Sequence, residues 1–202
     1  MPPFQEPTVD PKTLDAYDQR APDYAREWNH QAPPSDMYAL LLRHFSPGPT
    51  VDVGCGSGRD LAWLTAQGFE ALGVEASTGL LTQARTLHPD QRFALAALPE
   101  LANLQAGSFQ NVLCETVIMH LPDEQIAPAT RRLRELLRPG GTLYLSWRVT
   151  PEASIRDAAG RLYTAFDRRV VREALGSVHV LLDDESQSVS SGKRVHRLIV
   201  RV

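Results

Sequence analysis

Apolar residues follow two alternating patterns along this chain. Short runs rich in leucine and β-branched residues predict buried strands, at 50–53, 70–74, 92–96, 111–115 and 142–147. Between these runs, leucine and alanine recur three or four positions apart and predict helices, at 35–45, 59–67, 77–87 and 123–138. Strands that alternate with helices form a mostly parallel sheet with helices on both faces, so the pattern predicts an α/β fold.

The N-terminal part of the chain differs from this central pattern. Residues 1–12 are rich in proline and polar groups, and we expect a loose lead-in there. Residues 13–28 predict a helix, or a pair of helices interrupted at Pro22. Two tyrosines of this segment, Tyr17 and Tyr24, are expected to contact a ligand or to anchor the segment to the core.

The C-terminal part carries weaker signals. We expect a helix over 167–175 that ends at Gly176, because glycine is common just beyond the last helical turn. Two further strands are expected at 178–182 and 197–202, with the polar residues 183–194 as a loop between them. At 202 residues and 43% hydrophobic content, the chain is expected to bury one core as a single domain.

A glycine-rich turn follows the first central strand. Gly54, Gly56 and Gly58 stand at every second position, and a helical pattern begins directly after them. Glycines allow the backbone to approach a ligand closely, and a helix start offers unpaired N–H groups. The spacing differs from the G-x-G-x-x-G of dinucleotide sites, and Asp52 would repel a pyrophosphate but suit an ammonium group. The stretch therefore predicts a cofactor loop.

An acidic residue ends the second strand. Glu75 lies about twenty residues beyond the first glycine of the turn, where nucleotide-binding folds place a carboxylate that accepts hydrogen bonds from ribose hydroxyls. The alternative is a solvated carboxylate at a strand end. Because a glycine turn typical of cofactor loops precedes Glu75 in the sequence, the ribose contact is favoured.

Composition narrows the classes of partner. The formal net charge of −3 is spread along the chain without a basic block, which argues against nucleic acid. We find no run near the roughly 18 to 20 apolar residues of a membrane span and no signal peptide at the start, so we expect a cytoplasmic protein. Cys55 and Cys114 have no metal-ligand spacing, so both are expected to be reduced and no metal is predicted.

Together these motifs resemble one family. The series Asp52-x-Gly54-x-Gly56-x-Gly58 followed by Glu75 resembles motif I and the ribose acid of the class I S-adenosylmethionine (SAM) dependent methyltransferases. The string Leu137-Arg-Pro-Gly-Gly-Thr-Leu143 and the opening Tyr17-Asp-Gln-Arg-Ala-Pro-Asp-Tyr24 are also similar to that family, in its small-molecule branch. The resemblance covers residues 13–202.

The resemblance implies a Rossmann-like, seven-stranded, mostly parallel sheet with helices on both faces and an antiparallel C-terminal hairpin. It divides the chain into N-terminal lid helices at 13–46, a SAM-binding core at 50–147, and a substrate-side segment with the last strands at 148–202. The residues expected to bind SAM are Asp52, Gly54, Cys55, Gly56, Gly58, Glu75, Ala76, Ala97, Leu98 and Glu115. An acid that holds adenine in many relatives is missing after the third strand, where Ala96, Ala97 and Leu98 stand instead.

The implied reaction transfers the methyl group of SAM to a nitrogen, oxygen or sulfur atom of a small molecule and yields S-adenosylhomocysteine. His120 and Tyr24 are candidate proton acceptors, although His120 fits a purely structural bond to loop backbone equally well. Tyr17, Trp147 and Arg148 are candidate substrate contacts, and charge on a mobile loop is the alternative for the arginine.

Two other functions fit parts of the pattern. A NAD-binding oxidoreductase would share the strand, the glycine turn and the acid, but no hydride-transfer residues are evident. A SAM-fold protein that only binds a ligand or a partner would explain the missing adenine acid. The acceptor and the oligomeric state stay open, since a fold alone does not select a substrate.

Overall fold

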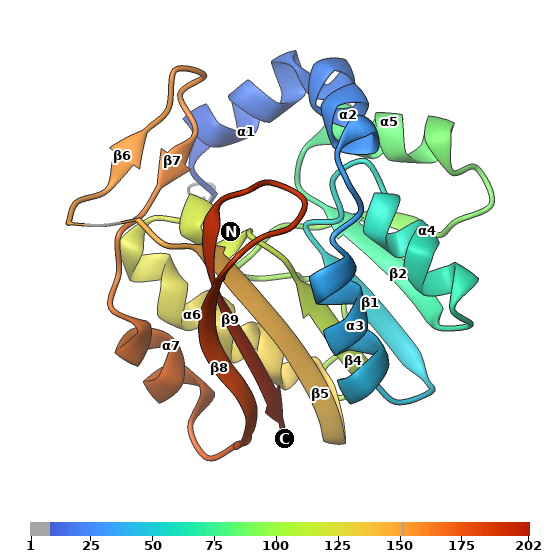
Figure 1. Ribbon diagram of the computed structural model, residues 1–202, viewed down its shortest axis with the longest axis vertical. Coiled ribbons are helices and arrows are strands. Elements are labelled where there is room, and N and C mark those ends of the chain that lie inside the picture. Colours follow the sequence, from blue (N-terminus) through green and yellow to red (C-terminus); the bar gives the residue numbers. More distant parts are fainter. Residues whose placement is uncertain (1–8, 151) are drawn as a thin grey trace, which may run out of the picture.

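Seven strands form one sheet in the order β3-β2-β1-β4-β5-β9-β8 in the computed structural model, which describes residues 9–150 and 152–202 (Figure 1). The first five strands along the chain are β1 (Pro49–Val53), β2 (Glu70–Glu75), β3 (Phe93–Leu95), β4 (Phe109–Cys114) and β5 (Leu137–Arg148). They pair in parallel, whereas β9 (Arg194–Arg201) pairs antiparallel with both β5 and β8 (His179–Gln187). The predicted sheet with its antiparallel C-terminal hairpin is confirmed.

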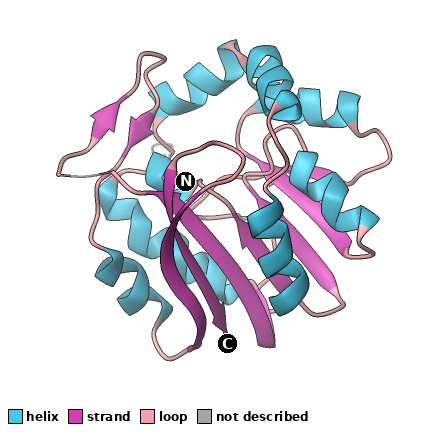
Figure 2. Cartoon of the chain, in the orientation of Figure 1, coloured by secondary structure: helices cyan, strands magenta, loops and turns pink. Residues whose placement is uncertain are grey.

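Helices cover both faces of this sheet, as Figure 2 shows. The helices are α1 (Pro11–Gln19), α2 (Ala21–His30), α3 (Ser35–His44), α4 (Arg59–Ala66), α5 (Thr78–Leu87), α6 (Asp123–Glu135) and α7 (Arg168–Leu175), with a short 3-10 helix, η1 (Ile118–His120). Apolar residues of α6 and α7 pack on one face, and those of α3 and α4 pack on the other. The helix–strand alternation read from the apolar pattern is therefore correct.

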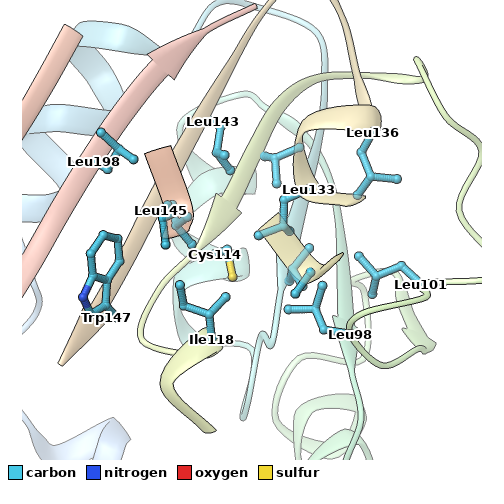
Figure 3. Packing of buried hydrophobic residues seen from close by; sticks show 14 of the residues in the cluster. Leu98, Leu101, Cys114, Ile118, Leu133, Leu136, Leu143, Leu145, Trp147 and Leu198 are labelled. Carbon is cyan, nitrogen blue, oxygen red and sulfur yellow. The ribbon is translucent and has the colours of Figure 1, made fainter. Parts of the chain in front are cut away.

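The larger core lies between α6, α7 and one face of the sheet. Along β5, Leu143 and Leu145 belong to this core while Tyr144 belongs to the core of the opposite face, as the two-residue period of a strand requires. Figure 3 shows leucines of this core from β5, β9 and α6 packed around the buried Cys114. Both cysteines are buried and unpaired.

The N-terminal boundary differs from the expectation. Helix α1 begins at Pro11, because the Asp10 side chain caps it by accepting from the Thr13 N–H at 2.9 Å. The lead-in thus ends two residues earlier than expected, and residues 1–8 of it lie outside the described residues. The break between α1 and α2 falls at Arg20, and Pro22 sits in the first turn of α2, where its missing N–H costs nothing.

The C-terminal hairpin is longer than expected. Residues 183–187 extend β8 instead of forming a loop, and the turn is limited to 188–193. Their alternating exposure shows that one side of this edge strand faces solvent, which explains the polar residues. A two-stranded sheet of β6 (Ile155–Arg156) and β7 (Leu162–Tyr163) was not predicted. No helix within the described parts of the chain is long and apolar enough to cross a membrane.

Candidate functional site

A cavity of about 350 Å³ lies where the parallel strands end. Its lining comes from the turn after β1, from the segments that follow β2, β3 and β4, and from the last residue of β5. The carboxyl ends of parallel strands form the ligand crevice of open α/β sheets, so this is the expected place for a site. Helices α1 and α2 lie beside α5 beyond one end of the sheet and add Tyr17 and Trp28 to the lining (Figure 1).

Most of the residues predicted to bind ligands line this cavity. Those that line it are Tyr17, Gly54, Cys55, Gly56, Glu75, Ala76, Ala97, Leu98, Glu115, His120 and Arg148. Four others, Tyr24, Asp52, Gly58 and Trp147, lie behind the lining.

At two positions of the glycine turn the backbone lies close to a neighbouring side chain. Gly54 and Gly56 have positive φ values of 74° and 54°. A Cβ atom on Gly54 would collide with the Val117 side chain, and one on Gly56 would lie 2.8 Å from the Trp28 ring. Only glycine fits at these positions, which leaves the backbone of the turn open toward the cavity.

Glu75 joins the glycine turn to the end of β2. Its Oε2 accepts from the Gly56 N–H, and its Oε1 accepts from the N–H groups of Ala76 and Ser77, all at 2.9 Å. Burial raises the pKa of Glu75, and these three backbone donors oppose the rise. A carboxylate has about four lone-pair positions, so it retains room for a hydroxyl donor from the cavity.

Buried carboxyl groups gather around the strand ends. Asp52 is buried, and its Oδ2 has no hydrogen-bond partner among the described residues. Burial and neighbouring acids raise its pKa well above the ordinary value. Glu115 lines the cavity, and burial raises its pKa to about 7 although the Ser146 hydroxyl donates to its Oε2. A cation bound nearby would relieve both costs.

The segment after β3 gives the cavity an apolar wall. Ala96, Ala97 and Leu98 line it together with Leu80 of α5. Leu98 is 4% exposed and belongs to the main core, so this wall is held firmly. It suits a flat apolar ring.

His120 is held by hydrogen bonds at both ring nitrogens. Nδ1 lies 2.6 Å from the Leu162 carbonyl oxygen, and Nε2 lies 2.9 Å from the Tyr17 hydroxyl. Because a carbonyl only accepts, Nδ1 carries the proton and Nε2 accepts from Tyr17. Burial lowers the pKa of His120 to about 4, so the ring is neutral near pH 7. In this arrangement His120 positions Tyr17 and has no free nitrogen for a substrate proton.

Trp147 and Arg148 face opposite sides of β5. Trp147 is buried, stacks on His196 at 4.4 Å between ring centroids, and contacts Phe166. Arg148 lines the cavity, with its guanidinium carbon 5.0 Å from the centroid of the Tyr163 ring. Successive residues of a strand point to opposite faces, so only one of these neighbours reaches the cavity.

Tyr24 is buried behind the cavity and its hydroxyl has no partner among the described residues. Its ring packs against Tyr17 and Trp28, and Arg161 lies 4.8 Å from its centroid. Tyr24 therefore supports the lining residues from behind. Gly58, with a φ of 84°, starts α4 beside the Phe93 ring.

Comparison with known proteins points to one family of enzymes. A family model described as a methyltransferase domain matches residues 51–145. Ubiquinone biosynthesis O-methyltransferase of Xanthomonas campestris pv. campestris (strain B100) is 31% identical over 155 residues, 69% of this chain and 64% of that protein. This chain thus spans less than two thirds of that relative. These findings support a class I SAM-dependent methyltransferase domain.

Solved structures share the fold of this chain. The 1,6-didemethyltoxoflavin-N1-methyltransferase of Burkholderia thailandensis, whose crystal structure holds S-adenosylhomocysteine, aligns with a TM-score of 0.76 at 20% identity, covering 98% of this chain and 93% of that one. The [4+2]-cyclase SpnF aligns with a TM-score of 0.71 at 13% identity, covering 98% of each chain. The same fold therefore also occurs in a protein named for a different reaction.

The order of the strands in the sheet argues against a NAD-binding oxidoreductase. Dinucleotide-binding sheets have the order 3-2-1-4-5-6. In this chain the antiparallel β9 lies between β5 and β8.

Several residues that line the cavity were not predicted from sequence. They are Trp28, Arg59, Asp60, Leu80, Met119, Arg161 and the turn residues Ser190 and Lys193. Ser190 links the β8–β9 turn to α2 and to the glycine turn, because its hydroxyl lies 3.2 Å from Gln31 Oε1 and 3.4 Å from Arg59 Nη1. These contacts join segments far apart in the chain, so no local pattern could reveal them.

Proposed function

We propose that this protein transfers a methyl group from SAM to a small-molecule acceptor and releases S-adenosylhomocysteine. The observation that carries the proposal is Glu75, a buried carboxylate that binds the Gly56 N–H at 2.9 Å in the wall of the cavity. This bond places the ribose acid and the glycine turn in one rigid unit. SAM, when bound, supplies a methyl group on a positively charged sulfur.

The residues of the chain fit the parts of this ligand. Glu75 accepts a ribose hydroxyl, and the wall of Ala97 and Leu98 packs on adenine. Glu115, with Asp52 buried behind the turn, provides the negative field that a sulfonium and an ammonium group require. Asp52 acts here without direct contact, since it does not line the cavity, and a bound cation would lower its raised pKa and favour its ionised form.

Catalysis then depends on orientation of the nucleophile and on exclusion of water from the cavity. The aromatic side chains of Tyr17, Trp28 and Tyr163 line the side of the cavity away from the sheet. They restrict water and hold the nucleophile in line with the methyl group, which accounts for much of the acceleration of a displacement reaction. His120 supports Tyr17 as its hydrogen-bond acceptor.

A second candidate function is ligand binding without methyl transfer. It is favoured by His120, whose two ring nitrogens are both engaged, so the cavity has no free histidine base in the part of the chain described. A measurement of S-adenosylhomocysteine release distinguishes methyl transfer from ligand binding alone.

The test combines binding and turnover. Titration calorimetry with SAM and with NADH is expected to show binding of SAM alone. Release of S-adenosylhomocysteine is then measured with thiols, amines, phenols, carboxylates, tellurite and selenite. Release with one class supports methyl transfer; tight SAM binding with no release from any class favours a binding protein; NADH binding without SAM binding rejects the proposal.

A further inference from the structure

The cavity has a second end that the SAM contacts do not use. Five side chains form a connected group there, which we call the acceptor end: Tyr17, His120, Arg148, Arg161 and Tyr163. Tyr17 binds His120 at 2.9 Å, and the His120 and Tyr163 rings lie 4.9 Å apart. Arg148 and Arg161 both lie over the Tyr163 ring, at 5.0 and 5.8 Å. The acceptor end is thus aromatic and cationic, and none of its five members is acidic.

The two arginines differ in how their charge is balanced. Arg161 forms an ion pair with Asp157, whose oxygen lies 2.7 Å from its Nη2, and its guanidinium is surrounded by the rings of Tyr17, Tyr24 and Tyr163. It therefore holds the aromatic wall together. Arg148 has no carboxylate within ion-pair distance in residues 9–150 and 152–202. Its positive charge is left for a ligand.

The position of Arg148 suits recognition of an anion. It is the last residue of β5, paired with Val195 of β9, so the sheet fixes its backbone at the cavity rim. The Tyr163 side chain supports the guanidinium through its ring and a hydrogen bond, and the five N–H donors of an arginine leave others available for a ligand. Those donors match the two oxygens of a carboxylate or phosphate.

Resting on the proposed function, we propose that the methyl acceptor is a planar molecule that carries an oxyanion, and that Arg148 binds this group. The rings of Tyr17 and Tyr163 contact the planar body, and Met119 lines the same cavity. The anion is held at the end of β5, while the SAM contacts come from the turn after β1 and the end of β2. One end of the acceptor is therefore anchored away from the glycine turn, which leaves its nucleophilic atom facing the methyl group.

The test measures binding to the protein saturated with S-adenosylhomocysteine. The probes are benzoate, salicylate, 4-hydroxybenzoate and phenylacetate, each paired with its neutral carboxamide, together with phenyl phosphate. Binding is compared for the unchanged protein, Arg148→Gln, Arg148→Lys and Arg168→Gln, the last of which changes an exposed arginine on α7. A hydrogen-bonded charge pair predicts about ten- to hundredfold tighter binding of at least one carboxylate than of its amide.

We expect this preference in the unchanged protein and in Arg168→Gln, its loss in Arg148→Gln, and partial retention in Arg148→Lys. Tighter binding of phenyl phosphate, lost in the same variant, would identify phosphate as the oxyanion at Arg148. The inference is overturned if amides bind as well as carboxylates, if Arg148→Gln keeps the preference, or if no probe binds. Binding of S-adenosylhomocysteine is measured first, so failure at that step counts against the proposed function, and failure only at the second step counts against Arg148.

Discussion

Replacing Glu115 by glutamine should stabilise this protein above neutral pH. Glu115 lines the cavity at the end of β4 and is partly buried. Its Oε2 accepts from the Ser146 hydroxyl, and a glutamine oxygen can accept the same bond. The substitution therefore removes the charge and retains the contact.

The magnitude follows from the pKa of this carboxyl, which burial raises from 4.5 to about 7. Below pH 4.5 the carboxyl is protonated in both the folded and the unfolded protein, so burial of its charge costs nothing. Above pH 7 it is ionised in both states, and the folded state bears the full cost of the buried charge. A rise of this size corresponds to at most about 3.4 kcal/mol, and partial exposure reduces the expected effect to about 1–2 kcal/mol.

The assay is urea unfolding at several pH values from 4.5 to 8.5. The free energy of unfolding of Glu115→Gln, minus that of the unchanged protein, should grow as the pH rises from 4.5 to about 7 and should level off above that value. Glu173→Gln, on the exposed side of α7, reports the same chemical change at the surface. A difference that stays constant with pH, or one that shrinks as pH rises, would refute the reasoning that burial dominates at Glu115.

Three further predictions concern Asp18 on α1, His120 and Gly56 in the glycine turn. Asp18→Ala removes bonds of 2.6 and 2.8 Å to the Ser77 hydroxyl and the Gly79 N–H of α5, so it should lower the free energy of unfolding by about 2 kcal/mol in urea, unlike exposed Asp15→Ala. The ring signals of His120 should not titrate between pH 5.5 and 8 in NMR spectra, since its pKa is about 4; a midpoint near 6.5 would contradict its burial. Gly56→Ala should abolish SAM binding in calorimetry, because its Cβ would lie 2.8 Å from the ring of Trp28; unchanged affinity would show that the turn can relax.

The parts of the site that are close in sequence could be predicted from it. The glycine turn and Glu75 belong to one β–α–β unit, so their spacing alone indicates where they meet. The apolar pattern likewise predicts the parallel strands, because strands buried on both faces read as continuous apolar runs.

The acceptor end could not be predicted in the same way. Arg161 reaches the cavity through the β6–β7 sheet, whose strands of two residues leave no pattern. Trp147 and Arg148 were both expected at the substrate, and strand alternation allows only Arg148. The polar residues 183–187 are predicted as a loop from sequence, yet they form part of an edge strand with one solvent-facing side. Each difference depends on contacts between distant segments.

The central claim is that Glu75 and the glycine turn hold SAM, and calorimetric titration of Glu75→Ala with SAM tests it most directly. The matched control is Glu70→Ala, which changes the exposed first residue of the same strand. Circular dichroism checks that both variants fold, since Glu75 also binds three backbone N–H groups. Loss of hydrogen bonds from a charged acceptor predicts about ten- to hundredfold weaker SAM binding for Glu75→Ala and unchanged binding for Glu70→Ala. Equal affinity of a folded Glu75→Ala and the unchanged protein would contradict the account.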